Sequence, residues 1–482
     1  MTHATYPFLH LLRVSSMLLA LAPAGLAANI NAANCSNSAI QGAINAASDG
    51  DVIVIPAGSC SWTASVNVPD AKGVTLRGAG ASSTIITMNG NTLYLNTAMA
   101  RTPVRVTGIQ FRHSDVTRAL QITGTARNWR IDNNIFDQAN IRSVYSLRVG
   151  ASNCNVDSFT YGVIDSNRFI RGNGGVFLFV EWPRGAAEPV ACGDHVWSLP
   201  PEHGTAQAVY IEDNVFESAG TRSQIIDSRW GAKYVLRYNT IHNPWISTHS
   251  GCTNGGRNPI WTEVYKNVFT DDSNRYTGSQ IEMRSTSGII WANRAASSLG
   301  TFRITVDHER SYRTDCKGPY GGTANGTQLF DMSSDSQALW PVFGQPGWGP
   351  PQLTDMRSAL FAGFFAWENQ NAAAPVNLSI ANNNGYTSVQ LQFGRELFNS
   401  SNLRTGPFAG RPNVCAITSS SRDVYISTDE NAQGATIYVC SGTGVSNTWV
   451  RHWEPYPYPH PLRGTPVSGP PLPPTGVTVR VQ

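Results

Sequence analysis

A short pattern containing Asn recurs down the middle of this chain of 482 residues. Its full form is Asn-x-Phe after alternating apolar and polar residues, as in Ile131-Asp132-Asn133-Asn134-Ile135-Phe136. Further copies, two of them with the Phe replaced, begin at Asn167, Asn214, Asn239, Asn267 and Asn293. Three of the intervals between successive Asn residues are 25, 28 and 26 residues, and the other two are 33 and 47. A recurring period of this size is typical of a solenoid.

The repeats predict an all-β fold, a parallel β-helix. Each repeat holds short runs rich in Val, Ile, Tyr and Phe, separated by turn-forming residues. About 25 residues is too short for a strand-helix-strand unit of ~30 residues or more, and it suits three strands and three turns. The recurrent Asn is expected at a tight turn, where its amide tolerates left-handed backbone angles and bonds the backbone and its copies. The Phe should point inward and stack on its copies.

The ends of the chain suggest how the solenoid is closed. Ser36 to Ala47 has apolar residues on one helical face, which predicts a helix that caps the first coil. The period fades near residue 330, so we expect a β-helix over 29–330 and a loop-rich C-terminal region over 331–465 that packs on it. A terminal hairpin is expected between 424–426 and 437–439. Residues 466–482 read as a Pro-rich tail.

The first 28 residues predict a signal peptide. Arg13 is the single charged side chain among them, and the apolar run that follows ends in small residues. We expect cleavage near Ala27 or Ala28 and a secreted or periplasmic protein. The net charge of +3 is too small to indicate nucleic acid or an anionic membrane as a partner. We also expect a monomer.

Eight cysteines fit an exported protein. Their order suggests four local pairs, namely Cys35–Cys60, Cys154–Cys192, Cys252–Cys316 and Cys415–Cys440. Eight cysteines allow 105 pairings, so the sequence leaves the connectivity open.

Two segments near the start resemble a known superfamily. Residues 49–58 read Asp-Gly-Asp-Val-Ile-Val-Ile-Pro-Ala-Gly, and residues 73–80 read Gly-Val-Thr-Leu-Arg-Gly-Ala-Gly. Together they resemble the opening of the pectin-lyase-like superfamily, and the resemblance covers roughly residues 30 to 310. It implies a right-handed parallel β-helix and an activity on polysaccharides, as in pectate, alginate and chondroitin lyases, polygalacturonases and phage tailspikes.

The chain departs from the hydrolase branch of that superfamily. That branch is marked by Asn-x-Asp, Asp-Asp, Gly-His-Gly and Arg-x-Lys motifs. Here Asp271-Asp272 is present, but His249 lies in Thr-His-Ser, and Arg303-Ile304-Thr305 lacks the Lys. The resemblance therefore transfers no hydrolase residue, and the calcium and arginine motifs of pectate lyases are not clearly present either.

Three segments at comparable places after the Asn turns predict one outward face. Residues 226–229, 246–249 and 281–284 each begin with an Ile that should point inward. Because side chains alternate along a strand, the second and fourth residues should point outward. The second residues are Asp227, Ser247 and Glu282, and the fourth are Arg229, His249 and Arg284. Neighbouring coils lie ~4.8 Å apart, which matches the repeat of an extended sugar chain.

This face suits an acidic polysaccharide, because Arg binds uronate carboxylates in a bidentate manner. In a β-elimination, His249 would be the base and Arg229 and Arg284 would neutralise the carboxylate. Asp227 and Glu282 supply the oxygen ligands that Ca²⁺ prefers, so calcium is the expected cofactor.

Two other readings of the same face stay open. In an inverting hydrolase Asp227 and Glu282 would be the acid and the base. Two rungs separate them by ~9.6 Å, which is at the outer edge of the ~6.5–9.5 Å expected between the two carboxyl groups. An adhesin or tailspike-like protein would use the face for binding alone. A solvated face with internal ion pairs is the non-functional alternative.

Four more residues are expected to contact substrate near this face, each with a structural alternative. Glu181 lies on the preceding coil and is otherwise a loop carboxylate, and Lys233 is otherwise a surface cation. Trp230 and Trp245 are expected to stack on sugar rings, with core packing as the alternative. The sequence as a whole predicts a secreted lyase acting on a uronate-containing polysaccharide.

Overall fold

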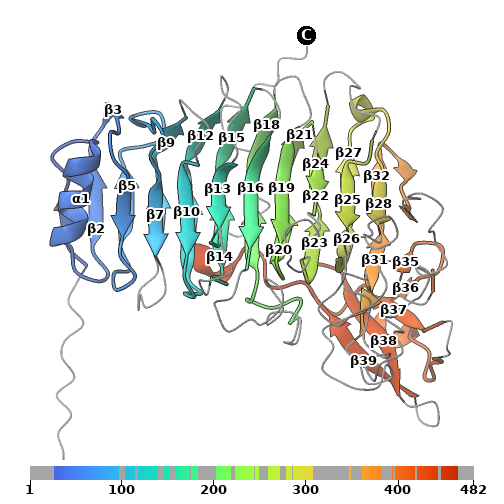
Figure 1. Ribbon diagram of the computed structural model, residues 1–482. Helices are drawn as coiled ribbons and strands as arrows, with labels where there is room; N and C mark the ends of the chain where they lie inside the picture. Colours follow the sequence, from blue (N-terminus) through green and yellow to red (C-terminus); the bar gives the residue numbers. More distant parts are fainter. Residues whose placement is uncertain are drawn as a thin grey trace, which may run out of the picture.

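The computed structural model describes residues 27–96, 104–113, 118–138, 145–151, 158–172, 175–182, 202–218, 223–243, 245–248, 259–271, 278–284, 286–307, 347–348, 361–380, 393–394, 397–417, 421–442 and 447–464. These residues form a long rod with α1 over one end and a small sheet near the other (Figure 1). In this part of the chain no helix is long and apolar enough to cross a membrane. The signal-peptide prediction concerns residues 1–28, of which 1–26 lie outside the described part. The predicted tail, residues 466–482, lies outside it as well.

Three sheets run along the rod, and each coil adds one strand to each of them. Sheet A consists of β1 (Asn29–Asn31), β2 (Val52–Ile55), β5 (Thr75–Gly78), β8 (Arg105–Thr107), β11 (Trp129–Asp132), β14 (Gly162–Asp165), β17 (Val209–Glu212), β20 (Lys233–Arg237), β23 (Trp261–Tyr265), β26 (Ser287–Trp291), β31 (Phe364–Trp367) and β35 (Leu397–Asn399). Sheet B consists of β3 (Gly58–Ser61), β6 (Thr84–Thr87), β9 (Gln110–Arg112), β12 (Ile135–Gln138), β15 (Arg168–Arg171), β18 (Val215–Ser218), β21 (Thr240–His242), β24 (Val268–Thr270), β27 (Arg294–Ala295), β32 (Gln370–Asn371) and β33 (Ala374–Pro375).

Sheet C completes each coil before the chain returns to sheet A. It consists of β4 (Val66–Val68), β7 (Leu93–Asn96), β10 (Leu120–Thr123), β13 (Tyr145–Val149), β16 (Val176–Glu181), β19 (Gln224–Arg229), β22 (Ile246–Ser247), β25 (Ile281–Arg284), β28 (Ile304–Asp307) and β34 (Leu378–Ile380). Neighbouring strands pair parallel in all three sheets, apart from β32 with β33. The predicted all-β parallel β-helix is confirmed.

The recurrent Asn residues form a buried ladder between sheets A and B. The Nδ2 of Asn214 donates to Oδ1 of Asn239 over 3.1 Å, and Asn239 donates in the same way to Asn267 over 3.0 Å. The same side-chain bond joins each rung to the next through Asn134, Asn167, Asn214, Asn239, Asn267, Asn293 and Asn369. Since these amides are buried, their mutual bonds satisfy polar groups that water cannot reach.

The left-handed backbone that we expected at the Asn itself belongs to the residue before it. Positive φ angles, between 52° and 57°, occur at Asn133, Ser166, Asp213, Tyr238, Lys266, Ala292 and Glu368. The ladder Asn uses its amide instead to hold the turn, since Nδ2 of Asn134 also donates to the carbonyl oxygens of Asp132 and Val106. A residue other than glycine in the left-handed conformation costs about 1–2 kcal/mol of conformational free energy, and these hydrogen bonds offset that cost.

The Phe residues two places after the ladder stack inside the rod, as predicted. Ring centroids lie 5.3 Å apart for Phe111 and Phe136, and 4.8 Å apart both for Phe136 and Phe169 and for Phe169 and Phe216. All four rings are buried. The stack follows from the register, because Phe136, Phe169 and Phe216 are direct partners in sheet B.

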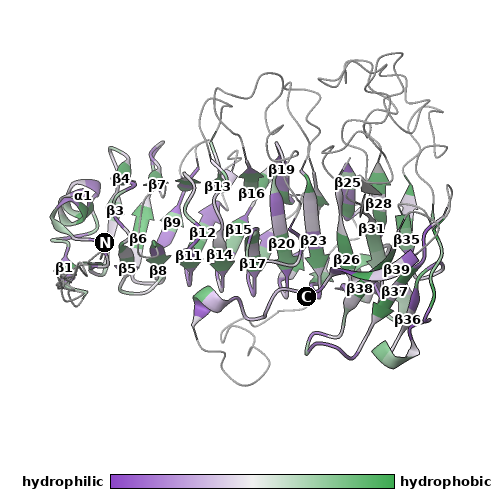
Figure 2. Cartoon of the chain, turned by 90° about the horizontal axis from the view of Figure 1, so that it is seen from below, coloured by the Kyte–Doolittle hydropathy of each residue, from purple (hydrophilic) through white to green (hydrophobic). Residues whose placement is uncertain are grey.

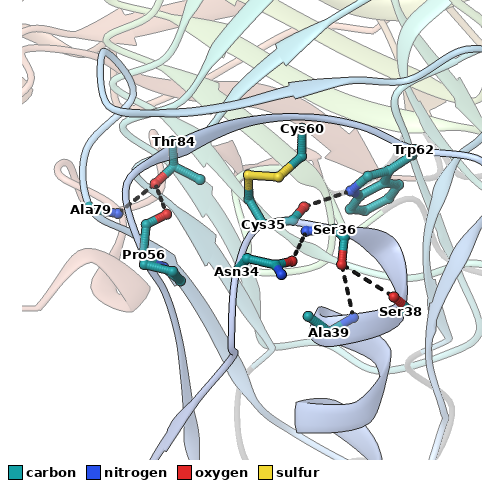
Figure 3. Close-up of a disulfide and its surroundings, with 10 residues drawn as sticks. All are labelled: Asn34, Cys35, Ser36, Ser38, Ala39, Pro56, Cys60, Trp62, Ala79 and Thr84. Carbon is teal, nitrogen blue, oxygen red and sulfur yellow. Dashed lines mark hydrogen bonds between the residues drawn. A yellow bond between two sulfur atoms is a disulfide. The ribbon is translucent and has the colours of Figure 1, made fainter.

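The helix α1 (Asn37–Ala46) caps the first coil, as predicted. The Ser36 hydroxyl accepts a bond from the backbone N–H of Ala39, which starts the helix (Figure 3). Ile40 and Ile44 of the helix are buried. The Cys35–Cys60 disulfide ties the start of this helix to β3. The Cys415–Cys440 disulfide is also present, so two of the four predicted pairs are confirmed, and the other four cysteines lie outside the described residues.

The β-helix continues beyond residue 330, where we expected it to end. Strands β31, β32 and β34 add a further coil that pairs in register with β26, β27 and β28, and β35 extends sheet A once more. The 76-residue interval between Asn293 and Asn369 hides this coil from a search for the period. A short antiparallel pair, β29 (Gly347–Trp348) with β30 (Phe361–Ala362), precedes it, and a 3-10 turn, η2 (Ser297–Leu299), follows β27.

The C-terminal region forms a small sheet of four strands. It consists of β36 (Arg404–Gly406), β37 (Val424–Ser427), β38 (Thr436–Gly442) and β39 (Asn447–Trp453), with η4 (Phe408–Gly410) after β36. Strands β37 and β38 pair antiparallel, which confirms the predicted hairpin. Trp453 packs edge-on against Tyr265, Trp291 and Trp367, so this sheet covers the outer side of sheet A near its end (Figure 2).

A strap, residues 454–463, runs back along the outside of sheet A to η5 (Pro461–Arg463), beside β11 and β14 (Figures 1 and 2). The Arg237 guanidinium donates to the carbonyl oxygens of Tyr456 and Pro457 over 2.6 and 2.8 Å, and to Glu212. Arg463 lies 3.1 Å from both Asp165 and Glu212. The strap therefore covers a row of charged and aromatic side chains on the outer side of sheet A.

The ladder predicts a stability test. Asn239→Ala removes the oxygen that accepts the backbone and side-chain N–H groups of Asn214. It also removes the Nδ2 that donates to two backbone carbonyl oxygens and to the Oδ1 of Asn267. Because these groups stay buried without partners, we expect the free energy of unfolding to fall by about 2–4 kcal/mol in chemical denaturation. Asn45→Ala, an exposed Asn on α1, is the control and should change it by less than about 0.5 kcal/mol. Equal losses in the two variants would contradict a special role for the ladder.

Candidate functional site

The three segments predicted to form one face are adjacent rungs of sheet C. Ile226 pairs with Ile246, which pairs with Ile281, and Ser247 pairs with Glu282. All three Ile side chains are buried inside the rod. The alternate side chains on β19, β22 and β25 therefore share the outward side of sheet C, which we call the candidate face together with the outward residues of β13 and β16.

Two cations of the predicted outer row are present on this face. Arg229 ends β19 and Arg284 ends β25, and they keep 16% and 28% of their side-chain surface exposed. His249, the expected base, lies outside the described residues, directly after Thr248. Arg284 lies 3.0 Å from Glu282 on its own strand, and its backbone N–H donates to the Thr248 hydroxyl over 2.6 Å.

Glu181 occupies the centre of the face rather than a loop. It ends β16 and is the direct partner of Arg229. Its Oε1 accepts from Nε of Arg229 over 2.5 Å, and its Oε2 accepts from Nε of Arg148 over 2.8 Å. Glu181 is fully buried, so a substrate cannot reach its oxygens. It therefore positions two guanidinium groups, whereas we had expected it to contact substrate.

The electrostatics of this group are those of a buried triad. Burial raises the pKa of Glu181, and the neighbouring guanidiniums of Arg148 and Arg229 counteract that shift. Arg148 is also nearly buried, lies about 5.6 Å from the Phe179 ring centroid and is the register partner of Phe179. Two cations that share one carboxylate keep an excess positive charge under the face.

Sequence reasoning missed Arg148. The signal was present, because Leu147-Arg148-Val149 places two apolar residues around one outward position, as Leu178-Phe179-Val180 does on the next coil, and the outward residue of the first segment is charged. Leu147 and Leu178 are 31 residues apart, which departs from the intervals of 25 to 28 residues, so the two segments could not be aligned by the period alone.

The acidic row is less accessible than predicted. Asp227 is only 3% exposed, and its Oδ1 accepts the backbone N–H of Ser228 over 2.8 Å. Ser247 is buried too, whereas Glu282 is partly exposed beside Arg284. Of the predicted substrate contacts in this row, only Glu282 therefore presents a carboxylate near solvent.

The described residues do not fit a calcium site. No group of three or more His, Cys, Asp or Glu side chains gathers among them. Asp227 and Glu282 lie two rungs apart, and Asp227 is only 3% exposed with its Oδ1 accepting the backbone N–H of Ser228, so it presents little to a metal ion. Calcium stays a prediction, and no catalytic step below depends on it.

Trp230 is packed rather than open to a sugar, whereas Trp245 keeps part of its surface exposed. Trp230 is buried in a left-handed turn, and the Arg229 guanidinium lies 3.9 Å from its ring centroid. Trp245 is partly buried directly before β22, where its carbonyl oxygen accepts the backbone N–H of Ile225 over 2.7 Å. Trp230 instead supports Arg229, since a cation over an indole face is favourable.

Lys233 does not join the candidate face. Only three residues separate β19 from β20, so Lys233 already begins the next strand of sheet A. Its ammonium lies 5.4 Å from the Trp182 ring centroid and 4.0 Å from a carboxylate oxygen of Glu202. Burial lowers the pKa of Lys233 to about 8. It is a buried structural cation at the corner between sheets C and A.

Lys233 gives the protein a specific dependence on pH. The unfolded chain, with a pKa of 10.5 for this lysine, binds more protons than the folded one between about pH 8 and 10.5. The free energy of unfolding of the wild type should therefore rise by about 3 kcal/mol relative to Lys233→Met across this window. Chemical denaturation of both proteins at pH 7 and 10.5 measures the difference, and parallel curves would contradict the burial of a titrating amine.

The triad also makes a prediction. Glu181→Gln leaves Arg148 and Arg229 buried without their counter-charge, and we expect it to lower the free energy of unfolding by about 3–5 kcal/mol. Adding Arg148→Met removes one of the two cations and should restore part of the loss. A double-mutant cycle should give a coupling of about 1–3 kcal/mol, and additive losses would show that the contacts are not coupled.

Comparisons with known proteins give a limited result. No family model and no curated protein sequence matches the chain. Among solved structures, the chain is similar to an alginate lyase from Paenibacillus sp. str. FPU-7, with 14% identity and a TM-score of 0.30 over 58% of this chain and 93% of that one. It is also similar to a PL6 family alginate lyase, AlyGC, with 11% identity and a TM-score of 0.26 over 85% of this chain and 55% of that one. These values carry no conclusion about activity.

Proposed function

We propose that the chain is a secreted polysaccharide lyase that cleaves a uronate-containing polysaccharide by β-elimination on the candidate face. The observation that carries the proposal is the register of β19, β22 and β25, which places Arg229 and Arg284 in one outward row. The two disulfides fit an exported protein, since such bonds persist in oxidising compartments.

The geometry suits an extended anionic chain. Successive rungs repeat every ~4.8 Å, so sugars lying along the sheet would meet a new set of side chains at each coil. Arg229 is fixed by Glu181 and by the Trp230 ring, which holds its guanidinium in one orientation. Arg284 is the more exposed cation and would take the uronate carboxylate in a bidentate manner.

The proposed reaction removes the proton on the carbon next to the uronate carboxyl. His249 would take that proton, and the electron pair left behind forms a carbon-carbon double bond as the adjacent glycosidic C–O bond breaks. The leaving sugar oxygen then takes a proton from the His249 imidazolium or from water, so the products are an unsaturated uronate and a new chain end. Arg284 and Arg229 stabilise the negative charge that develops on the carboxylate in the transition state.

Hydrolysis on the same face has less support. An inverting hydrolase needs two accessible carboxyl groups, and Asp227 is almost completely buried. Binding without reaction uses the same cations, so it is separated from the lyase by product analysis alone.

The decisive assay screens pectate, alginate, glucuronan and glycosaminoglycans for the ultraviolet absorbance of an unsaturated uronate. New absorbance supports the lyase. New reducing ends without that absorbance mean hydrolysis, and binding without either product means an adhesin. Each of the last two outcomes would replace the proposal.

Substitutions test where the chemistry occurs. Arg284→Ala and His249→Ala should each lower turnover at least about a hundredfold with folding intact, because each removes a group that acts in the transition state. Arg294→Ala, an exposed Arg on sheet B, is the control and should keep the wild-type rate. Wild-type rates in both test variants would rule out catalysis on this face.

A further inference from the structure

The small C-terminal sheet has two different faces. Ile426, Ile437 and Trp453 belong to the continuous core of the rod, so one face is buried against sheet A. The opposite face carries the alternate residues of β37 to β39. Tyr425 is the register partner of Tyr438, and Trp449 is the partner of Cys440 on the next strand. This second face, which we call the aromatic face, points away from the rod.

One guanidinium lies on the aromatic face among three rings. Arg411 lies 4.1 Å from the ring centroid of Tyr438, 4.6 Å from that of Phe408 and 6.0 Å from that of Trp449. Within the described part of the chain, its side chain has no ion pair with a carboxylate. A guanidinium held through its flat side keeps its N–H donors at the edge available for an anion.

The carboxylates around Arg411 are engaged elsewhere. Asp429 accepts the backbone N–H of Phe408 over 2.7 Å and the Ser427 hydroxyl over 3.0 Å. Glu430 accepts the Tyr438 hydroxyl over 2.6 Å and lies 3.6 Å from Arg451. Among the described residues, Arg451 therefore has carboxylate partners, whereas no carboxylate pairs with Arg411.

A second cation lies on the same face. Arg404 on β36 is the parallel register partner of Tyr425, so both side chains leave the sheet on one side. Arg404 is exposed, and no ion pair to it occurs among the described residues. Two cations beside aromatic rings suit a ligand that combines repeated carboxylates with flat apolar surfaces.

Hydrogen bonds hold the side chains of the aromatic face in place. The Tyr425 hydroxyl donates to the Pro407 carbonyl oxygen over 2.7 Å, and Nε1 of Trp449 donates to the Pro412 carbonyl oxygen over 2.7 Å. A side chain at Gly406 would come within 2.8 Å of the Tyr425 hydroxyl, so glycine is needed for this close approach. Phe408 is held on that segment and is still 42% exposed. Such prior ordering lowers the entropic cost of binding.

We propose that the aromatic face is a second, non-catalytic binding site for anionic carbohydrate. A uronate carboxylate would accept two N–H bonds from Arg411 while the sugar ring stacks on Phe408 or Trp449, and Arg404 would take a neighbouring carboxylate. The substrate class rests on the proposed function, but the site needs no catalysis. It lies on a sheet that packs on sheet A, whereas the candidate face belongs to sheet C. It would therefore hold the polymer near the rod while another stretch occupies the candidate face, which raises the local substrate concentration.

Affinity electrophoresis in gels that contain polygalacturonate or alginate tests this site. Full-length Arg284→Ala protein serves as the background, so that the polymer stays uncut. We expect Arg411→Ala to weaken retardation in that background at least about tenfold. Arg411→Lys should recover little, because an ammonium lacks the bidentate fork. Arg451→Ala, which removes a cation that is already paired on the same sheet, is the matched control and should change little.

The outcomes separate this inference from the lyase. Retardation that depends on Arg411 supports the site even if the wild type cleaves no polymer. Full retardation of Arg411→Ala overturns the site, whatever the activity of the wild type. Equal retardation in gels that contain polyglutamate would overturn it too, because the ligand would then be an acidic peptide. A neutral dextran gel, in which no retardation is expected, guards against sieving, and the near-ultraviolet circular dichroism of each variant confirms folding.

Discussion

The buried amide ladder is the interaction on which the rest of the structure depends. Each ladder Asn donates both its side-chain Nδ2 and its own backbone N–H to the Oδ1 of the next, as Asn214 does to Asn239 and Asn239 does to Asn267. These bonds hold the turn between sheets A and B in the coils from Asn134 to Asn369. Because a shift of one residue would turn each inward side chain outward, a fixed turn also fixes which residues form the core.

That constraint explains how the rod tolerates long insertions without losing the candidate face. The interval between Asn167 and Asn214 is 47 residues, yet Phe169 and Phe216 still stack at 4.8 Å. Loop closure costs little for each added residue, whereas a broken ladder would leave buried amides without partners. The chain between two strands can therefore vary in length while the strands keep their register, as Glu181 and Arg229 do across this insertion.

The repeat period allowed the register of the strands to be predicted from the sequence. Features that do not follow the period were missed. Residues 226, 246 and 281 were aligned correctly because each follows a recognised Asn turn and begins with an inward Ile. The coil at 364–380 was missed because 76 residues separate its Asn369 from Asn293. Lys233 was assigned to the wrong face because turn length, not the period, decides where one strand ends and the next begins. The partners of Glu181 could not be foreseen either, since burial depends on neighbours from two other coils.

The charged side chains on sheets A and C differ in how strongly their partners hold them. In the proposed function this difference favours Arg284 as the cation that binds substrate. On sheet A, Arg237 is buried and bonded to Glu212 and to two strap carbonyls, so releasing it would leave several buried groups without partners. On sheet C, Arg229 is bonded to the fully buried Glu181 and is similarly costly to release. Arg284 pairs with Glu282 where both are partly exposed, and such a pair contributes only about 0–1 kcal/mol. In the proposed function a uronate carboxylate would therefore replace Glu282 at little cost, whereas the buried pairs would keep their partners and hold the face in place.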